Sequence, residues 1–182
     1  MSIPMPQRAP RALILLFTVA IAGCGTGTEE PTDDGGAPQS FIAFAGDFKG
    51  FRSWQSYSYS SDGGSIHNSG PRTEYINQLP PPGSTSFPVG TIIIKDIVSQ
   101  RPDFFAMVKR SATYDPGGAK GWEWFDLIDN GDGQTVTINW RGYGPRLGES
   151  YGGDPTACNV CHKAETANDS VLSPKIRLSE IH

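Results

Sequence analysis

The sequence is poor in side chains that bind metals or carry out redox chemistry. Its 182 residues include only three cysteines, three histidines and three methionines. It also has little continuous apolar sequence, and the run Ala12–Cys24 is too short to span a bilayer as a stable helix. Long segments with a 3.6-residue period are absent, and Gly and Pro are frequent, which excludes a bundle of four long helices. The chain has the size of one domain with additional segments at its ends.

The N-terminal segment has the pattern of a secretory signal. Arg8 and Arg11 precede the apolar run, and small residues end it. The last four residues of the run, Ile21–Cys24, resemble a bacterial lipobox, which implies cleavage before Cys24 and lipidation of its sulfur. The alternative is an ordinary signal peptide with an incidental cysteine. Either form predicts an exported protein in an oxidising compartment.

The expected mature chain is acidic. Loss of residues 1–23 removes two arginines and leaves 13 basic against 19 acidic residues, a formal charge of −6. No basic cluster remains to neutralise a run of phosphates, which argues against nucleic-acid binding. Residues 24–40 predict a lipidated cysteine and a flexible tether, and residues 41–182 the folded domain. The membrane is then contacted only through the N-terminal lipid, and Gly25 favours the outer membrane, facing the periplasm, in a host with two membranes.

The other two cysteines belong to the strongest motif of the sequence, Cys158-Asn159-Val160-Cys161-His162. A disulfide between them would close a very small loop and add little stability. A structural zinc site needs four ligands at suitable spacing, and a redox dithiol should open the helix of a β-α-β unit; neither pattern is present. Covalent haem c accounts for all three side chains, with thioether bonds from Cys158 and Cys161 and with His162 as the proximal iron ligand.

The chain offers little for a second axial ligand. No methionine follows Cys161, and Met107 is embedded in a hydrophobic stretch. His67 lies in a Gly/Ser-rich segment and His182 ends the sequence, so each is more simply a solvent-exposed side chain. We therefore expect a five-coordinate iron with an open distal face, which binds or transforms small ligands rather than only passing electrons.

The remaining segments predict a β-rich domain. Aromatic residues recur at three- and four-residue steps in residues 41–54, which predicts an amphipathic helix. Residues 90–98 are β-branched and predict a strand, and 122–128 and 134–140 predict two more. In the first of this pair Trp122 and Trp124 predict one buried face, with contact to a haem edge as an alternative.

Short-range signals complete the pattern. Asp129–Gly133 has the chemistry of a hairpin, and it lacks the spacing and the final glutamate of a calcium-binding EF-hand loop. Residues 142–155 predict a loop, and residues 157–169 a short helix. Pro174 prevents a longer helix in the tail.

Six stretches, in order, resemble the cytochrome P-460 family, which includes the β-sheet cytochromes c′-beta: FRSWQSY, GPRTEYIN, FPVGTIIIKDIVS, FFAMVKR, GWEWF and ACNVCHKAETANDSVLSP. They span residues 51–174, and the third and the last are the most specific. The resemblance implies a mainly β (α+β) fold, an antiparallel β-sheet domain with a few helices and covalently bound haem c. Relatives in this family are often dimers, so it also allows a homodimer, although no interface stripe is legible in the sequence.

The resemblance draws attention to Lys95. A strand period of two places it on one face with Ile93 and Ile97. The simplest interpretation is a lysine that extends from an edge strand into solvent. In P-460 proteins the lysine of this motif bonds covalently to the porphyrin edge, so the resemblance implies a haem cross-link at Lys95. Burial would lower the pKa of such an amine and favour its neutral, nucleophilic form.

The resemblance also assigns two distal positions. Arg72 matches a basic residue of the family's distal pocket, where a fixed cation can hydrogen-bond a ligand; the alternative is an ordinary surface arginine. Phe105 falls where hydroxylamine-oxidising members carry a carboxylate that relays protons. Phenylalanine cannot accept a proton, and it implies an apolar distal pocket like that of the c′-beta proteins. Asp96 and Asp103 are close in sequence and are candidates to replace the missing carboxylate.

Two functions from different classes follow. The first is an oxidoreductase that acts on hydroxylamine or nitric oxide and passes electrons to a soluble partner such as another cytochrome; Lys95 favours it. The second is a protein that binds nitric oxide without turnover; Phe105 favours it. A plain electron carrier is disfavoured because a second axial ligand is missing.

Overall fold

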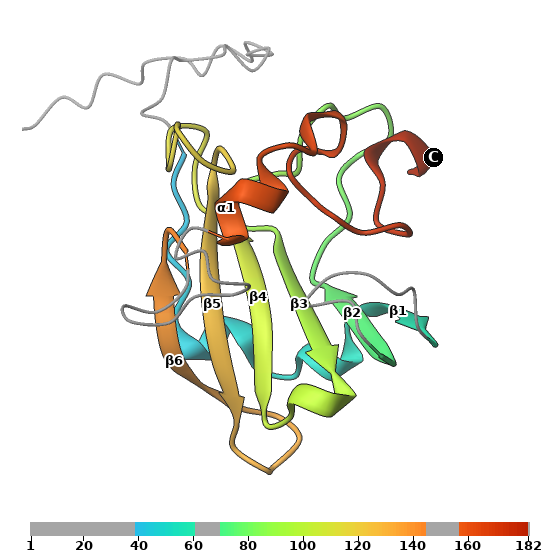
Figure 1. The fold of residues 1–182 in the computed structure, drawn as a ribbon, viewed down its shortest axis with the longest axis vertical. Helices are drawn as coiled ribbons and strands as arrows, with labels where there is room; N and C mark the ends of the chain where they lie inside the picture. Colours follow the sequence, from blue (N-terminus) through green and yellow to red (C-terminus); the bar gives the residue numbers. More distant parts are fainter. Residues whose placement is uncertain (1–38, 61–69, 145–156, 182) are drawn as a thin grey trace, which may run out of the picture. The chain divides into compact units, whose positions relative to one another are not determined.

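A computed structural model describes residues 39–60, 70–144 and 157–181 (Figure 1). The chain divides into two units, Met1–Gly35 and Gly36–His182, and all described residues belong to the second. The predicted signal peptide and nearly all of the tether lie outside the described residues, and so do Cys24, His67, His182 and most of the predicted loop at 142–155.

The described residues form an antiparallel sheet of six strands. Each strand pairs with the next one along the chain, so the spatial order of the strands is their sequence order. The strands are β1 (Gln55–Tyr59), β2 (Arg72–Ile76), β3 (Ile92–Ile97), β4 (Asp103–Lys109), β5 (Trp122–Asp129) and β6 (Val136–Gly142). The prediction of a mainly β, antiparallel fold with few helices is confirmed.

Both faces of this sheet are covered, because side chains alternate between two separate apolar clusters. Face 1 packs against the segment before β1, through Ala43, Phe48, Phe51, Ile92, Ile94, Phe104, Ala106, Val108, Phe125, Leu127 and Val136. Face 2 packs against the C-terminal segment, through Ile76, Phe87, Ile93, Met107, Ala119, Trp122, Trp124, Val171, Ile176 and Leu178. Trp122 and Trp124 thus share one buried face, as predicted.

The prediction of an amphipathic helix across residues 41–54 is wrong. Two short 3₁₀ helices take its place, η1 (Ala45–Phe48) and η2 (Phe51–Ser53). Gly50 between them has φ +69° and ψ 19°, a left-handed conformation that an α-helix cannot contain. Each short helix buries one phenyl ring against face 1, which explains the regular aromatic spacing without a continuous helix.

The predicted hairpin between β5 and β6 is confirmed. The carboxylates of its turn are used within the turn itself: Asp129 Oδ1 accepts from the amide of Gly131 at 2.9 Å, and Asp132 Oδ1 accepts from the amide of Thr135 at 2.7 Å. Hydrogen bonds from the Thr135 hydroxyl and from backbone amides lower the pKa of Asp132 to about 2. These carboxylates therefore stabilise a turn.

Candidate functional site

The cysteines and histidine of the motif lie on the short helix α1 (Ala157–His162), which Figure 1 shows at the end of β4 and the start of β5. The predicted helix over 157–169 is confirmed for this first part; a turn and the 3₁₀ helix η4 (Thr166–Asn168) follow it. Cys158 packs against face 2, Cys161 is exposed, and both are free thiols. Burial raises the pKa of the Cys158 thiol to about 12, which disfavours the thiolate form of this cysteine.

The backbone holds the ring of His162 in one orientation. Its Nδ1 lies 2.7 Å from the carbonyl oxygen of Ser170. Because a carbonyl oxygen can only accept, Nδ1 carries the proton and Nε2 of the neutral ring keeps its lone pair. The ring of Trp124 packs beside it, with 4.4 Å between ring centroids. This tautomer and orientation are those of a histidine that binds a metal through Nε2.

Asn159, which lies between the two cysteines, anchors α1 to the rest of the domain. Its Oδ1 accepts from the amide of Ala119 at 3.0 Å and from Trp124 Nε1 at 3.1 Å. Its Nδ2 donates to Asp115 Oδ2 at 2.7 Å and to the carbonyl oxygen of Tyr143 at 2.5 Å. One side chain thus joins the motif helix to β5, to the loop before β5 and to the residue that follows β6.

We expect Gly118→Ala to destabilise the domain by about 1–3 kcal/mol, because an added Cβ would overlap the Asp115 carboxylate and the Asn159 amide. Gly117→Ala is the matched control, since a Cβ there meets nothing within 4 Å. Thermal unfolding of both variants checks the prediction. Equal unfolding temperatures would mean that Asn159 does not anchor the helix.

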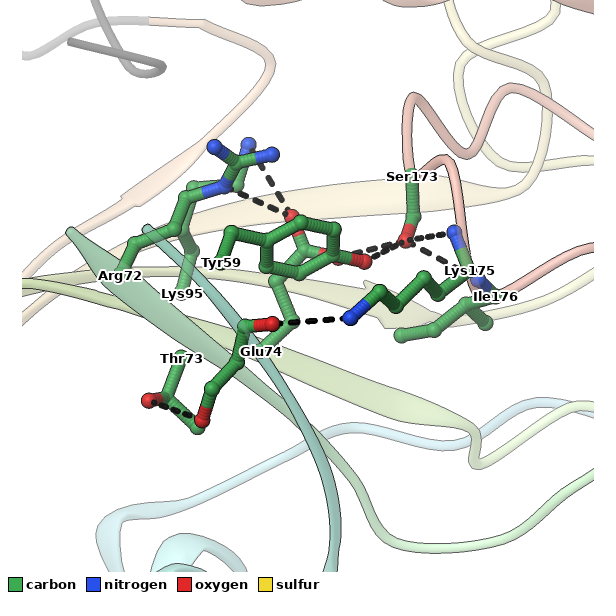
Figure 2. A network of polar contacts seen from close by, with 9 residues as sticks. Tyr59, Arg72, Thr73, Glu74, Lys95, Ser173, Lys175 and Ile176 are labelled. Atoms are coloured by element: carbon green, nitrogen blue, oxygen red, sulfur yellow. Dashed lines mark hydrogen bonds and ion pairs between the residues drawn. The ribbon is translucent and has the colours of Figure 1, made fainter. Parts of the chain in front are cut away.

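A buried cluster of polar groups lies on face 2, centred on Glu74 (Figure 2). Its carboxylate accepts from Arg72 Nε at 3.2 Å, from the Tyr59 hydroxyl at 3.1 Å and from the Ser173 hydroxyl. Lys95 Nζ forms an ion pair with it at 3.7 Å. Burial is the main cause that raises the pKa of Tyr59 to about 12, so this phenol stays protonated and donates. Glu74 therefore joins β1, β2, β3 and the C-terminal segment.

This cluster excludes the surface alternative for two predicted residues, Arg72 and Lys95. The Arg72 side chain is 0% exposed, so it is not an ordinary surface arginine. Lys95 lies on β3, in the interior of the sheet, with its side chain 17% exposed, so it is not an edge lysine extending into solvent. Sequence reasoning missed Glu74, although the strand period in RTEYIN places it on the same face as Arg72.

Phe105 lies between two charged residues on face 2. It is paired with Lys95 of β3 on one side and with Asp126 of β5 on the other. Its side chain is partly buried, and Asp126 Oδ2 accepts from Asn139 Nδ2 at 2.6 Å. Asp126 was not predicted, because only the pairing register of β4 and β5 brings it beside Phe105.

Asp96 and Asp103, the candidates to replace the missing distal carboxylate, lie on opposite faces of the sheet. Asp96 points to face 1, where it is 1% exposed and accepts twice from Arg101, at 2.8 Å each, so it cannot serve a site on face 2. Asp103 shares the face of Phe105 but begins β4, opposite Ile128. Glu74 and Asp126 are therefore the carboxylates that flank the Lys95–Phe105 pair.

Met107 is also on face 2, 6% exposed, in the apolar cluster against which Cys158 packs. It is paired with Ile93 on β3 and with Trp124 on β5. Among the described residues it is thus the methionine to test as a second axial ligand. No cluster of three or more His, Cys, Asp or Glu side chains suited to a bare metal ion occurs in the described ranges.

Comparison with protein-family models, with curated proteins and with solved structures found no match. The resemblance to cytochrome P-460 proteins stays a prediction from the sequence. Within the part of the chain that the structure describes, no helix is long and apolar enough to cross a membrane.

Proposed function

We propose that this protein is a monohaem c protein whose haem is held at α1. The observation that carries the proposal is the hydrogen bond between His162 Nδ1 and Ser170 O. His162 lies on the same six-residue helix as both free cysteines. A haem attachment motif requires two thiols and a histidine that presents Nε2, and this donor set fits. Cys158 and Cys161 would form the thioether bonds, and His162 would be the proximal ligand.

Bound haem c would supply an iron that binds small ligands and exchanges electrons with them. The chain's own contribution is the surface of face 2, from which Lys95, Phe105, Met107 and Trp124 project. Arg72 would supply the buried cation that the resemblance assigns to the distal pocket, and Glu74 can accept a proton from Lys95. Phe105 excludes water from the centre of this surface.

Within this class, we propose an oxidoreductase of the cytochrome P-460 type that acts on hydroxylamine or nitric oxide. A lysine amine, a buried carboxylate and a buried guanidinium on one face support it, because removal of hydrogen from an N–H bond requires a proton acceptor. The electrons removed from the substrate would pass to a soluble partner such as another cytochrome. Lipidation of Cys24, anchorage at the periplasmic face of the outer membrane and a homodimer belong to the same proposal.

The second candidate is a gas-binding protein without turnover, like the cytochromes c′-beta. Phe105 favours it, because a phenyl ring at the centre of face 2 cannot exchange protons. An optical spectrum of the reduced holoprotein, with and without nitric oxide, tests the class. We expect a high-spin haem spectrum that changes on addition of nitric oxide. A colourless protein, or a low-spin spectrum that Met107→Leu converts to high spin, would contradict an open haem site.

We expect a third protein–haem bond, from Lys95 Nζ to a carbon of the porphyrin edge, in addition to the two thioethers. This bond replaces one N–H and one C–H bond, so the holoprotein is mapped after exposure to a two-electron oxidant such as a peroxide. Peptide mapping of the holoprotein should find haem joined to the peptides of Lys95 and of the motif, with a red-shifted Soret band. Lys95→Met should abolish the haem-bound Lys95 peptide and the red shift of the Soret band. Lys175→Met, which removes an exposed amine that donates to Ser58 O, should preserve both. Haem held by thioethers alone in the wild-type protein would contradict the cross-link and move the assignment to the gas-binding function.

A further inference from the structure

The carbonyl group that orients His162 belongs to a strained turn. Asp169 has φ +47° and Ser170 has φ +69°, two successive non-glycine residues in the left-handed region. Such a conformation costs free energy at each residue and persists only where the surroundings enforce it. The strain is thus located at the residue that accepts the His162 hydrogen bond and at the residue before it.

Contacts from three parts of the domain hold Asp169 in place. Lys109 Nζ donates to Asp169 Oδ1 at 2.7 Å, and the amide of Phe87 donates to Oδ2 at 2.9 Å. Trp122 Nε1 donates to the Asp169 carbonyl oxygen at 2.7 Å. The amide of Ser170 donates to the carbonyl oxygen of Glu165 at 2.7 Å. The turn is therefore fixed to β4, to β5 and to the loop before β3.

Lys109 is the charged component of this support. Its side chain is 7% exposed at the end of β4, and Nζ also donates to the carbonyl oxygen of Lys120 at 3.1 Å. Burial lowers the pKa of the Lys109 amine, and the hydrogen bond from Lys109 to Asp169 opposes this shift. Gly121, at φ +89°, gives the side chain room, because a Cβ there would come 2.9 Å from Lys109 Nζ.

We propose that Lys109 and Asp169 are positioning residues for the proximal histidine, an inference that rests on the proposed haem site. They fix the Ser170 carbonyl oxygen so that Nδ1–H of His162 is always donated. A histidine that donates through Nδ1 is a more basic ligand at Nε2, and its ring cannot rotate. The Lys109–Asp169 pair therefore strengthens the iron–histidine bond and lowers the reduction potential of the haem.

The alternative is that this buried pair only stabilises the fold, and the two roles predict different results. Lys109→Met removes the charge while keeping most of the side-chain volume. Asp169→Asn removes the partner charge, and asparagine tolerates the left-handed conformation. Arg141→Met is the control, because Arg141 is paired with buried Glu123 at 2.7 Å, on face 1. All three variants should unfold at lower temperature than the wild type.

The test measures the iron–histidine stretching band by resonance Raman spectroscopy, and the reduction potential, on purified full-length holoprotein. We expect both Lys109→Met and Asp169→Asn to shift this band to lower frequency and the potential to more positive values, with Arg141→Met unchanged. Unchanged bands and potentials in variants that are less stable would overturn the positioning role. Absence of haem, or of a histidine band, in the wild type would instead overturn the proposed function.

A second pair of variants tests the turn without removing any charge. Ser170→Gly keeps the carbonyl group and accepts φ +69° without strain, so we expect the wild-type band. Ser170→Val opposes this φ through its branched side chain, so we expect the same shift as in Lys109→Met. If Lys109→Met fails to fold, the comparison of Ser170→Gly with Ser170→Val tests the inference in its place. Identical iron–histidine bands in these two variants would contradict the inference.

Discussion

In a Lys95→Met background, which removes the proposed third bond, the double alanine variant at Cys158 and Cys161 is expected to abolish covalent attachment of haem completely. In the proposed haem site each sulfur would form one thioether bond, and no other cysteine follows Cys24 in the sequence outside this motif. The double variant should show no haem signal on a denaturing gel and none in the reduced pyridine spectrum of the washed protein. The control is Cys24→Ala, which removes the third cysteine and should change membrane anchorage while full haem loading is retained.

The single variants distinguish the two sulfurs. Cys158 is packed against face 2, so Cys158→Ala removes buried volume as well as a bond, whereas Cys161 is exposed. We therefore expect Cys158→Ala to lower both loading and unfolding temperature, and Cys161→Ala to lower loading alone. Full covalent loading of the double variant would show that the motif is not the attachment site.

His162→Gln gives the complementary result. Glutamine keeps hydrogen-bonding capacity toward Ser170 O but supplies no imidazole nitrogen. Haem that still attaches through both thioethers should then lose its iron–histidine band. An unchanged band would assign proximal ligation to another histidine, in which case the orientation of His162 has a different purpose.

Local signals in the sequence were sufficient for the motif, the hairpin and the strand alternation. The motif is five consecutive residues, and alternation places Lys95 with Ile93 without knowledge of the partner strand. The helix expected in residues 41–54 failed because the same aromatic spacing arises from two 3₁₀ turns separated by a left-handed Gly50. The spacing of aromatic residues predicts which of them are buried. The backbone conformation also depends on single residues such as Gly50, whose positive φ is incompatible with a continuous α-helix.

The relation between distant residues could not be predicted. Asp126 lies beside Phe105 only because of the register of β4 against β5, and Glu74 reaches Ser173 across 99 positions of sequence. The Ser170 carbonyl group is eight positions from His162, yet its direction depends on two left-handed residues with no glycine to signal them. The motif therefore supplies only part of the candidate site, and residues from well-separated segments supply the rest.

Phe105→Glu is expected to raise hydroxylamine oxidation by about 10²–10⁴-fold, because it places a proton acceptor at the centre of face 2. The substitution adds a carboxylate between Lys95 and Asp126, the cross-strand neighbours of Phe105. The neighbouring Asp126 carboxylate disfavours the charged form of the new carboxylate, so the acceptor retains useful affinity for a proton. The side chain of Phe105 is only partly buried, so the domain should tolerate the change.

Phe105→Gln is the matched control, because glutamine has nearly the same size and polarity as glutamate but no basic group. Steady-state oxidation of hydroxylamine, with a soluble cytochrome or a chemical oxidant as electron acceptor, should rise in the glutamate variant alone. Nitric oxide affinity should fall in both variants, because each makes the apolar centre of the face polar. Equal rates for both would mean that the missing carboxylate does not limit turnover. A wild-type protein that already turns over rapidly would require another acceptor, and Asp126→Asn and Glu74→Gln would then show which flanking carboxylate supplies it.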